Sequence, residues 1–160
     1  MRRKDREIKN REDIIDVLSR CSVVRLGINN NDYPYVVPMN FGFEAEGESL
    51  SLWFHCATAG LKLDLIRKNP KVGFEADCSL SLVEGERARN FTMEYESVIG
   101  HGSIEICEDS ANKRHGLRAI MRQYAPGKDF DFRDEEIADL FVLRLDVVQI
   151  TGKRLKRAAH

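Results

Sequence analysis

Short segments of strand-like composition, separated by turns, dominate this chain and restrict the folds open to it. Residues 22–28 are apolar and β-branched, and residues 33–43 resume that composition after the turn-forming run at residues 29–32. A period of two in hydrophobicity continues at residues 50–54, 72–76 and 141–147. Antiparallel strands need only short turns, whereas parallel strands need long crossovers. Because alternating βαβ units are absent, the pattern predicts an antiparallel barrel rather than a Rossmann fold.

Segments with helical spacing decorate this barrel, and we expect them at residues 13–18, 61–66, 110–124 and 134–140. Asp109 or Ser110 can cap the third of these helices, and Asp134 can cap the fourth. Residues 79–90 are polar and are expected to form a loop. A long strand should follow over residues 91–107, bent at its two glycines, Gly100 and Gly102.

Two prolines, Pro34 and Pro38, fall inside the strand predicted over residues 33–43. Proline has no N–H to donate to a ladder, so this strand should lie at an edge, a bulge or an opening of the sheet.

Composition points to one ordinary globular domain spanning residues 1–160. The chain has 160 residues, 42% of them hydrophobic, and a formal net charge of −1. That balance gives no basic excess for nucleic-acid binding, and no apolar run approaches the ~20 residues of a membrane span. The N-terminus lacks the apolar region of a secretory signal, and the four cysteines form no C-x-x-C pair. We therefore expect a cytoplasmic protein with free thiols.

Basic residues cluster at both ends of the chain: Arg2, Arg3, Lys4, Arg6, Lys153, Arg154, Lys156 and Arg157. Solvated termini are the favoured interpretation. The alternative is that one of these arms reaches a bound anion.

Residues 54–62 form the most informative stretch, because a strand ends there, a turn of small residues follows and a helix begins. Free backbone N–H groups and the helix dipole favour a phosphate at such a point. Thr58 adds a hydroxyl and Lys62 adds a positive charge. On spacing alone, an ordinary helix start with a surface lysine is the favoured interpretation, and the stretch is not a Walker loop.

Two further stretches could contact a ligand. Across residues 35–42 the prolines leave backbone groups free for a bound ring, and Asn40 could hydrogen-bond it; an edge strand protected against aggregation is the alternative. Within residues 95–102 Ser97 could donate to a ligand oxygen, and the glycines allow close approach of another backbone. A bent barrel strand explains this last stretch equally well.

In this order, these stretches resemble the pyridoxamine 5′-phosphate oxidase-like superfamily of FMN-binding split barrels. The closest similarity is to its nitroimidazole-resistance (Nim-type) branch. The matching segments are residues 1–8, 37–42, 54–62, 69–72 and 95–100, and the similarity as a whole covers nearly the whole chain. The resemblance implies a mainly β fold with helices, a Greek-key-like antiparallel split β-barrel. It further implies a homodimer with FMN at its interface.

The same resemblance implies positions for the FMN. The flavin ring would lie along Val37, Pro38, Met39, Asn40 and Phe41, with His55 nearby as the catalytic residue. The phosphate would lie at the turn and helix start formed by Thr58, Gly60, Leu61 and Lys62. Further contacts would come from the later strand through Ser97 and Val98. Cys56 and Leu61 depart from the family pattern, and the terminal basic clusters could add charge from the partner subunit.

Two classes of function follow. In the first, the protein is an FMN-dependent oxidoreductase that passes electrons from NAD(P)H to a small acceptor such as a nitro compound, with His55 donating a proton. In the second, it binds flavin or heme without turnover, for storage, sensing or transfer. A deazaflavin in place of FMN also stays open. Pyridoxamine 5′-phosphate oxidation itself is disfavoured because only seven residues follow Lys153.

The histidines show no metal-ligand spacing with carboxylates or cysteines, so the sequence predicts no metal site. No Gly-x-Ser-x-Gly elbow is present either, which disfavours a hydrolase of that type.

Overall fold

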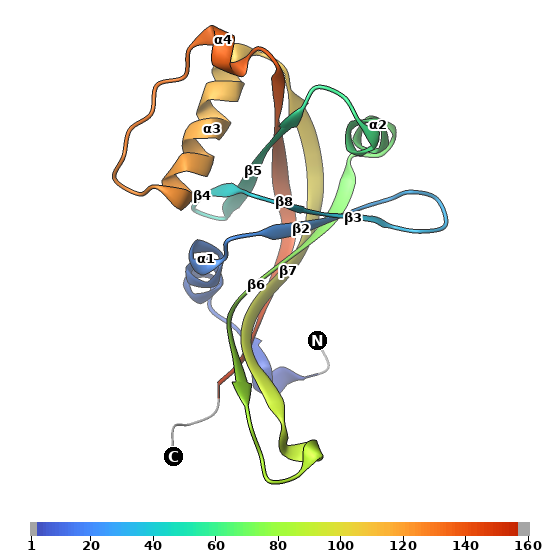
Figure 1. The fold of residues 1–160 in the computed structure, drawn as a ribbon, viewed down its shortest axis with the longest axis vertical. Coiled ribbons are helices and arrows are strands. Elements are labelled where there is room, and N and C mark those ends of the chain that lie inside the picture. Colours follow the sequence, from blue (N-terminus) through green and yellow to red (C-terminus); the bar gives the residue numbers. More distant parts are fainter. Residues whose placement is uncertain (1–2, 157–160) are drawn as a thin grey trace.

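Figure 1 shows the fold in a computed structural model, which describes residues 3–156. One antiparallel sheet contains the eight strands of this part of the chain, in the order β3-β2-β6-β7-β8-β5-β4, with β1 paired to β8. The strands are β1 (Glu7–Ile8), β2 (Val24–Ile28), β3 (Tyr35–Met39), β4 (Gly42–Glu46), β5 (Ser49–Ala57), β6 (Lys71–Val83), β7 (Thr92–Cys107) and β8 (Leu140–Leu155). The helices are α1 (Arg11–Arg20), α2 (Leu61–Lys68), α3 (Ser110–Tyr124) and α4 (Asp134–Ile137), with short 3₁₀ turns η1 (Lys4–Arg6) and η2 (Ala88–Asn90).

The two edge strands of this sheet, β3 and β4, are consecutive in sequence and are joined only by Asn40 and Phe41. The sheet therefore curls round until its two edges are linked by the chain itself, which gives a split barrel. The prediction of a single strand over residues 33–43 was wrong. The Phe41 side chain is fully buried, and its backbone N–H donates to the Tyr124 hydroxyl at 3.0 Å, so the strand breaks where it contacts α3. The predicted sheet edge at the prolines is confirmed.

Strands β6 and β7 extend beyond the body of the molecule as a long hairpin arm (Figure 1). A loop over residues 79–90 was predicted there, but β6 continues to Val83. The register shifts between Cys78 and Ser81, where Ser79 has a φ of 56°. The arm presents four exposed apolar side chains: Leu80, Leu82, Phe91 and Met93.

The remaining boundaries differ in detail from the sequence prediction. Strand β8 runs far past residue 147, to Leu155, because its second half pairs with β7 and β1. Helix α4 ends at Ile137 rather than Leu140. Asp134, the predicted N-cap, is the first residue of the helix, and Arg133 occupies the N-cap position. The predicted cap of α3 is confirmed, since Asp109 Oδ1 accepts the Asn112 N–H at 2.9 Å. The predicted irregularity at Gly102 is also confirmed by a register shift between β7 and β8.

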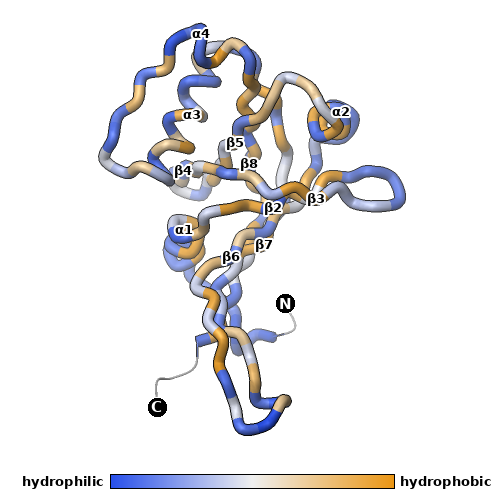
Figure 2. Tube along the Cα trace, in the orientation of Figure 1, coloured by the Kyte–Doolittle hydropathy of each residue, from blue (hydrophilic) through white to orange (hydrophobic). Residues whose placement is uncertain are grey.

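Buried apolar residues form two clusters on opposite faces of the sheet. The larger fills the barrel and includes Leu18 of α1, Leu63 of α2 and Phe54 of β5. The smaller packs α3 and α4 against β5 and β8 around Trp53 and Val142. Figure 2 shows hydrophobic segments where the strands cross and a strongly hydrophilic loop between β2 and β3. No helix within residues 3–156 is long and apolar enough to cross a membrane.

A buried carboxylate ties α1 and the end of β8 to the sheet. Glu96, on β7, has no exposed surface. Its oxygens accept from Arg20 Nη1 at 2.6 Å and from Ser79 Oγ at 2.9 Å, and they also pair with Arg154 and Lys156. Two residues of the C-terminal basic cluster are therefore ion-paired rather than simply solvated. Of the basic residues at the termini, Arg2 and Arg157 lie outside the described residues.

Candidate functional site

The start of helix α2 has the features expected of an anion site. Gly60 precedes the helix with a φ of 129°, a conformation that side-chain-bearing residues rarely adopt, and it has no side chain to cap the helix. The carbonyl of Gly60 accepts from the N–H groups of Leu63 and Asp64. The N–H groups of the first turn lack acceptors within a helix, so those of residues 61 and 62 face the turn before it.

Lys62 adds a positive charge at this helix start. Its side chain is half-buried, and its ammonium donates to the Met39 Sδ at 3.5 Å. A thioether is a weak acceptor. No ion pair joins Lys62 to an acidic residue within residues 3–156. A partly desolvated ammonium with so weak a partner suits an incoming phosphate.

Lys62 also brings two strand ends together. Met39 is the last residue of β3, and Cys56 lies at the end of β5. Burial raises the pKa of the Cys56 thiol, and the nearby charge of Lys62 opposes that rise. The ends of β3 and β5 and the start of α2 therefore lie close together around Lys62.

The predicted ring-binding segment presents mixed surfaces. Pro38 and Asn40 are exposed and Val37 is half-buried, whereas Met39 and Phe41 belong to the core. The N–H of Phe41 is already bonded to Tyr124. Side chains on the exposed side of β3 thus remain available to a ligand, and the backbone N–H of Phe41 does not.

His55, predicted as the catalytic residue, is exposed and lies opposite Val142 in the pairing of β5 with β8. Thr58, in the turn after β5, is exposed as well. So is Leu61, at 49% of its surface, on the first turn of α2. These side chains are free to meet a ligand at the end of β5.

Ser97 and Val98 lie on opposite faces of β7. Ser97 pairs with Asp77 and faces outward from the sheet. Val98 is fully buried in the barrel core, on the face opposite to Ser97.

A groove that the sequence did not reveal crosses the outer face of the sheet. It encloses about 550 Å³ and is lined by His101, Ser103, Lys71, Gly73 and Val148, with Pro70, Val72 and Gly102. Because the groove depends on the register of three strands, no single segment of sequence could indicate it. Within residues 3–156 no group of histidine, cysteine and carboxylate side chains is arranged to hold a metal ion.

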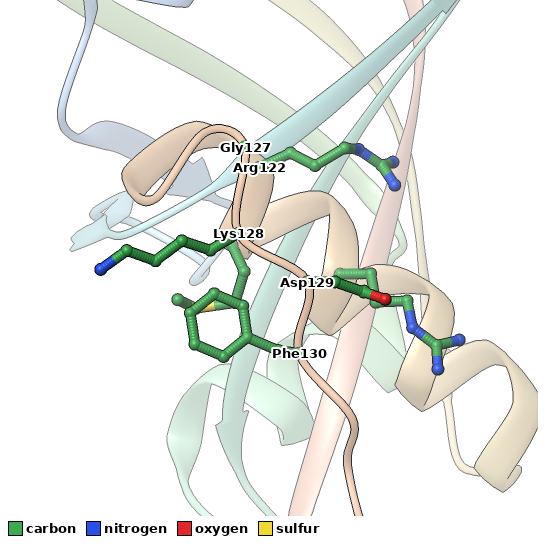
Figure 3. Close-up of a pocket in the computed structure, with 7 residues that line it drawn as sticks. Arg122, Gly127, Lys128, Asp129 and Phe130 are labelled. Atoms are coloured by element: carbon green, nitrogen blue, oxygen red, sulfur yellow. The ribbon is translucent and has the colours of Figure 1, made fainter.

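A second pocket, of about 310 Å³, lies between α3 and the loop that follows it (Figure 3). Arg118, Arg122 and Lys128 line it together with Met121 and Phe130. The two arginines already pair with carboxylates outside the pocket, and no residue singled out in the sequence lies here. The start of α2 therefore remains the better candidate.

Comparison with known proteins gives a consistent picture. A family model described as pyridoxamine 5′-phosphate oxidase matches residues 10–154. A candidate 5-nitroimidazole antibiotic resistance protein from Bacteroides thetaiotaomicron is 30% identical, with a TM-score of 0.79 over 92% of this chain and 85% of that chain. No curated protein sequence matches significantly.

Two more distant structures share the fold. A flavocytochrome from Azotobacter vinelandii is 22% identical, with a TM-score of 0.79 over 98% of this chain and 72% of its own. An FAD and heme binding protein from Mycobacterium smegmatis is 18% identical, with a TM-score of 0.80 over 97% and 76%.

Proposed function

Because the chain belongs to the pyridoxamine 5′-phosphate oxidase family, we propose that it binds FMN and passes electrons from NAD(P)H to a small acceptor such as a nitro compound. The bound flavin supplies the redox chemistry. The observation that carries the proposal is the start of α2. There, within residues 3–156, the half-buried ammonium of Lys62 has a thioether as its one hydrogen-bond partner, beside first-turn N–H groups without a side-chain cap. An anion the size of a phosphate completes both.

The phosphate contact gives the sharpest test. Lys62→Gln should weaken FMN binding by roughly 10- to 100-fold, because a charge-assisted contact contributes about 1.5–3 kcal/mol. Riboflavin has the same ring and no phosphate, so its affinity should hardly change. Lys68→Gln is the matched control, since Lys68 lies at the far end of the same helix and contacts Asn31. Quenching of flavin fluorescence measures the affinities of the natural chain and of both variants for FMN and riboflavin.

Two results contradict this assignment. Equal weakening of FMN and riboflavin in the Lys62 variant would mean that Lys62 supports the fold rather than the phosphate. Equal affinity of the natural chain for FMN and riboflavin would mean that no phosphate site exists. Including FAD in the same titrations decides which flavin the site prefers.

We further propose that the site is completed in a homodimer. The resemblance places both Lys62 and Ser97 at the flavin, yet Ser97 faces outward from the sheet whereas Lys62 contacts Met39, a buried core residue. The outer face of the sheet leaves apolar side chains exposed, including Val36 at 59%, Ile99 at 52% and Val148 at 76%. A second copy seated on this face covers them and brings its own β7 toward the flavin.

The dimer is tested by placing a charge on that face. Ile99→Lys should convert the dimer to monomers in sedimentation equilibrium and reduce FMN affinity in parallel. Glu12→Lys, an exposed charge change on α1, is the control and should alter neither. A monomeric natural chain that still binds FMN tightly contradicts the shared site.

We propose that His55 donates a proton to the bound substrate. His55 is exposed at the end of β5, next to Cys56, a thiol whose pKa is raised by burial against the opposing effect of the nearby Lys62 charge. His55→Gln should retain FMN binding and lower the turnover of a nitro acceptor at least 10-fold. Unchanged turnover would remove His55 from the mechanism.

A non-catalytic flavin- or heme-binding role is the second candidate. It is favoured by the shared fold with a flavocytochrome and with an FAD and heme binding protein. Anaerobic mixing of the flavin-loaded protein with NADH or NADPH separates the two roles. Bleaching of the flavin, followed by reoxidation by a nitro compound, supports the oxidoreductase. A flavin that neither nucleotide reduces, or uptake of heme in its place, supports the binding role.

A further inference from the structure

Two cysteines far apart in sequence meet where helix α1 packs on the sheet. Cys21 ends α1 and is 2% exposed, and Cys78 lies on β6 at the last paired position before the register shift. Both thiols point to the same acceptor, the Val17 carbonyl oxygen, with Sγ–O distances of 3.2 Å from Cys21 and 3.8 Å from Cys78. Cys78 is also among the groups that raise the pKa of the Cys21 thiol, so the two side chains lie close together.

The surroundings of the two sulfur atoms differ in a way that assigns them different roles. Cys78 is partly exposed, and its Sγ accepts from Arg20 Nη1 at 3.4 Å and from Ser79 Oγ at 3.7 Å. Arg20 shares its charge with Glu96 and Asp16, yet this Nη1 remains in contact with the sulfur. These donors can hydrogen-bond the negative charge that develops on the Cys78 sulfur as it reacts. Burial raises the pKa of the Cys21 thiol, which keeps Cys21 protonated until its partner has reacted.

We propose that Cys21 and Cys78 form a two-electron redox site that a hydroperoxide oxidises to an intrachain disulfide. The Cys78 thiol loses its proton as its sulfur attacks the peroxide, the O–O bond breaks, and Cys78 becomes a sulfenic acid. The leaving oxygen takes up that proton and departs as water or an alcohol. The Cys21 sulfur then attacks the Cys78 sulfur, an S–S bond forms, the S–O bond breaks, and water leaves with the Cys21 proton. Two thiols and one hydroperoxide thus yield one disulfide, water and the reduced peroxide.

This site is separate from the proposed flavin site. Cys78 lies on the face of the sheet that packs against α1, whereas Ser97 and Ile99 lie on the outer face. Cys56 is near Lys62, and Cys107 is in the cluster beneath α3. The disulfide would link the end of α1 to the base of the hairpin arm.

Peptide mapping tests the proposal directly, because trypsin places each cysteine in its own peptide. Cys21 falls in residues 21–25, Cys78 in residues 72–87, and Cys56 and Cys107 in two others. The folded, reduced protein is treated with a few equivalents of hydrogen peroxide, alkylated and digested. We expect a linked 21–25/72–87 peptide, loss of two of the four free thiols and recovery of both with dithiothreitol.

Variants separate the two roles. In Cys21→Ser, Cys78 should accumulate as a sulfenic acid that dimedone traps. In Cys78→Ser, Cys21 should keep its thiol at the same peroxide dose. Cys107→Ser is the control and should still form the linked peptide. The proposal is overturned if the natural chain gives no linked peptide at doses that oxidise Cys56 or Cys107, or if Cys78 is linked only between chains. These readings need no flavin, so they stand apart from any failure of the proposed function.

Discussion

Replacing Glu96 with glutamine removes the negative charge on which Arg20, Arg154 and Lys156 converge, with little change of shape. Burial alone would raise the pKa of Glu96. Hydrogen bonds from Arg20, Ser79 and Arg154 outweigh burial and lower the pKa from 4.5 to about 2. One pKa unit corresponds to about 1.4 kcal/mol, so the folded state favours the charged form by about 3 kcal/mol.

We therefore expect Glu96→Gln to lower the free energy of unfolding by about 3 kcal/mol at pH 7. For a chain of this size, that loss corresponds to a fall in Tm of roughly 6–12 °C. The effect must depend on pH. Because the pKa is lower in the folded state, the stabilisation is complete above the unfolded value of 4.5 and is lost as pH falls through about 2. At pH 3 less than half of it should remain.

Urea denaturation of both proteins at pH 7 and pH 3 gives the four free energies needed. Glu105→Gln is the matched control on the same strand. Glu105 is 61% exposed and pairs with Arg144 at 3.1 Å, so its loss should cost under about 1 kcal/mol. The reasoning is refuted if Glu96→Gln costs no more than Glu105→Gln at pH 7, or if its cost is the same at both pH values.

Two further substitutions test the contacts of helix α3. Gly42→Ala should destabilise the fold by about 1–3 kcal/mol in urea denaturation. A Cβ at this position would lie 2.2 Å from the Ala119 carbonyl oxygen, so α3 would have to move. An unchanged denaturation midpoint would contradict that close approach. Tyr124→Phe removes the hydroxyl that accepts the Phe41 N–H. It should lower the free energy of unfolding by about 1–3 kcal/mol and speed hydrogen exchange at the Phe41 amide. Slow exchange at that amide in the variant would show that another group protects it.

The strands were predictable where the local pattern decides the structure. A period of two located β5 and the start of β6, and the prolines marked β3 as an edge strand. The break between β3 and β4 was not predictable, because residues 33–43 have uniform strand composition. The contact that fixes the break comes from Tyr124, 83 residues later in the chain. The arm was missed for a related reason: its leucines alternate with serines, yet they stay exposed in the folded chain.

The candidate site divides in the same way. Gly60 and Lys62 lie within one continuous motif, so a strand end and a helix start were enough to predict that they meet. Met39 joins them through the barrel topology, which the family resemblance supplied. The groove near His101 lies where the register of β7 and β8 shifts, between His101 and Gly102. No local sequence pattern predicts which side chain such a shift exposes.

The alternation of β7 sharpens what the resemblance implied for Ser97 and Val98. Adjacent residues of a strand point to opposite faces, and here Val98 fills the core while Ser97 faces outward. Val98→Ala should therefore destabilise the fold, by on the order of 2 kcal/mol. Ser97→Ala should leave stability unchanged and weaken FMN binding if the partner's strand reaches the flavin.

Mixing Ser97→Ala with Lys62→Gln subunits provides the test: a shared site predicts that one of the two sites in the mixed dimer keeps both native residues and binds FMN at full affinity. Two weakened sites in the mixed dimer would place both residues at a flavin held by one chain and would refute the shared site.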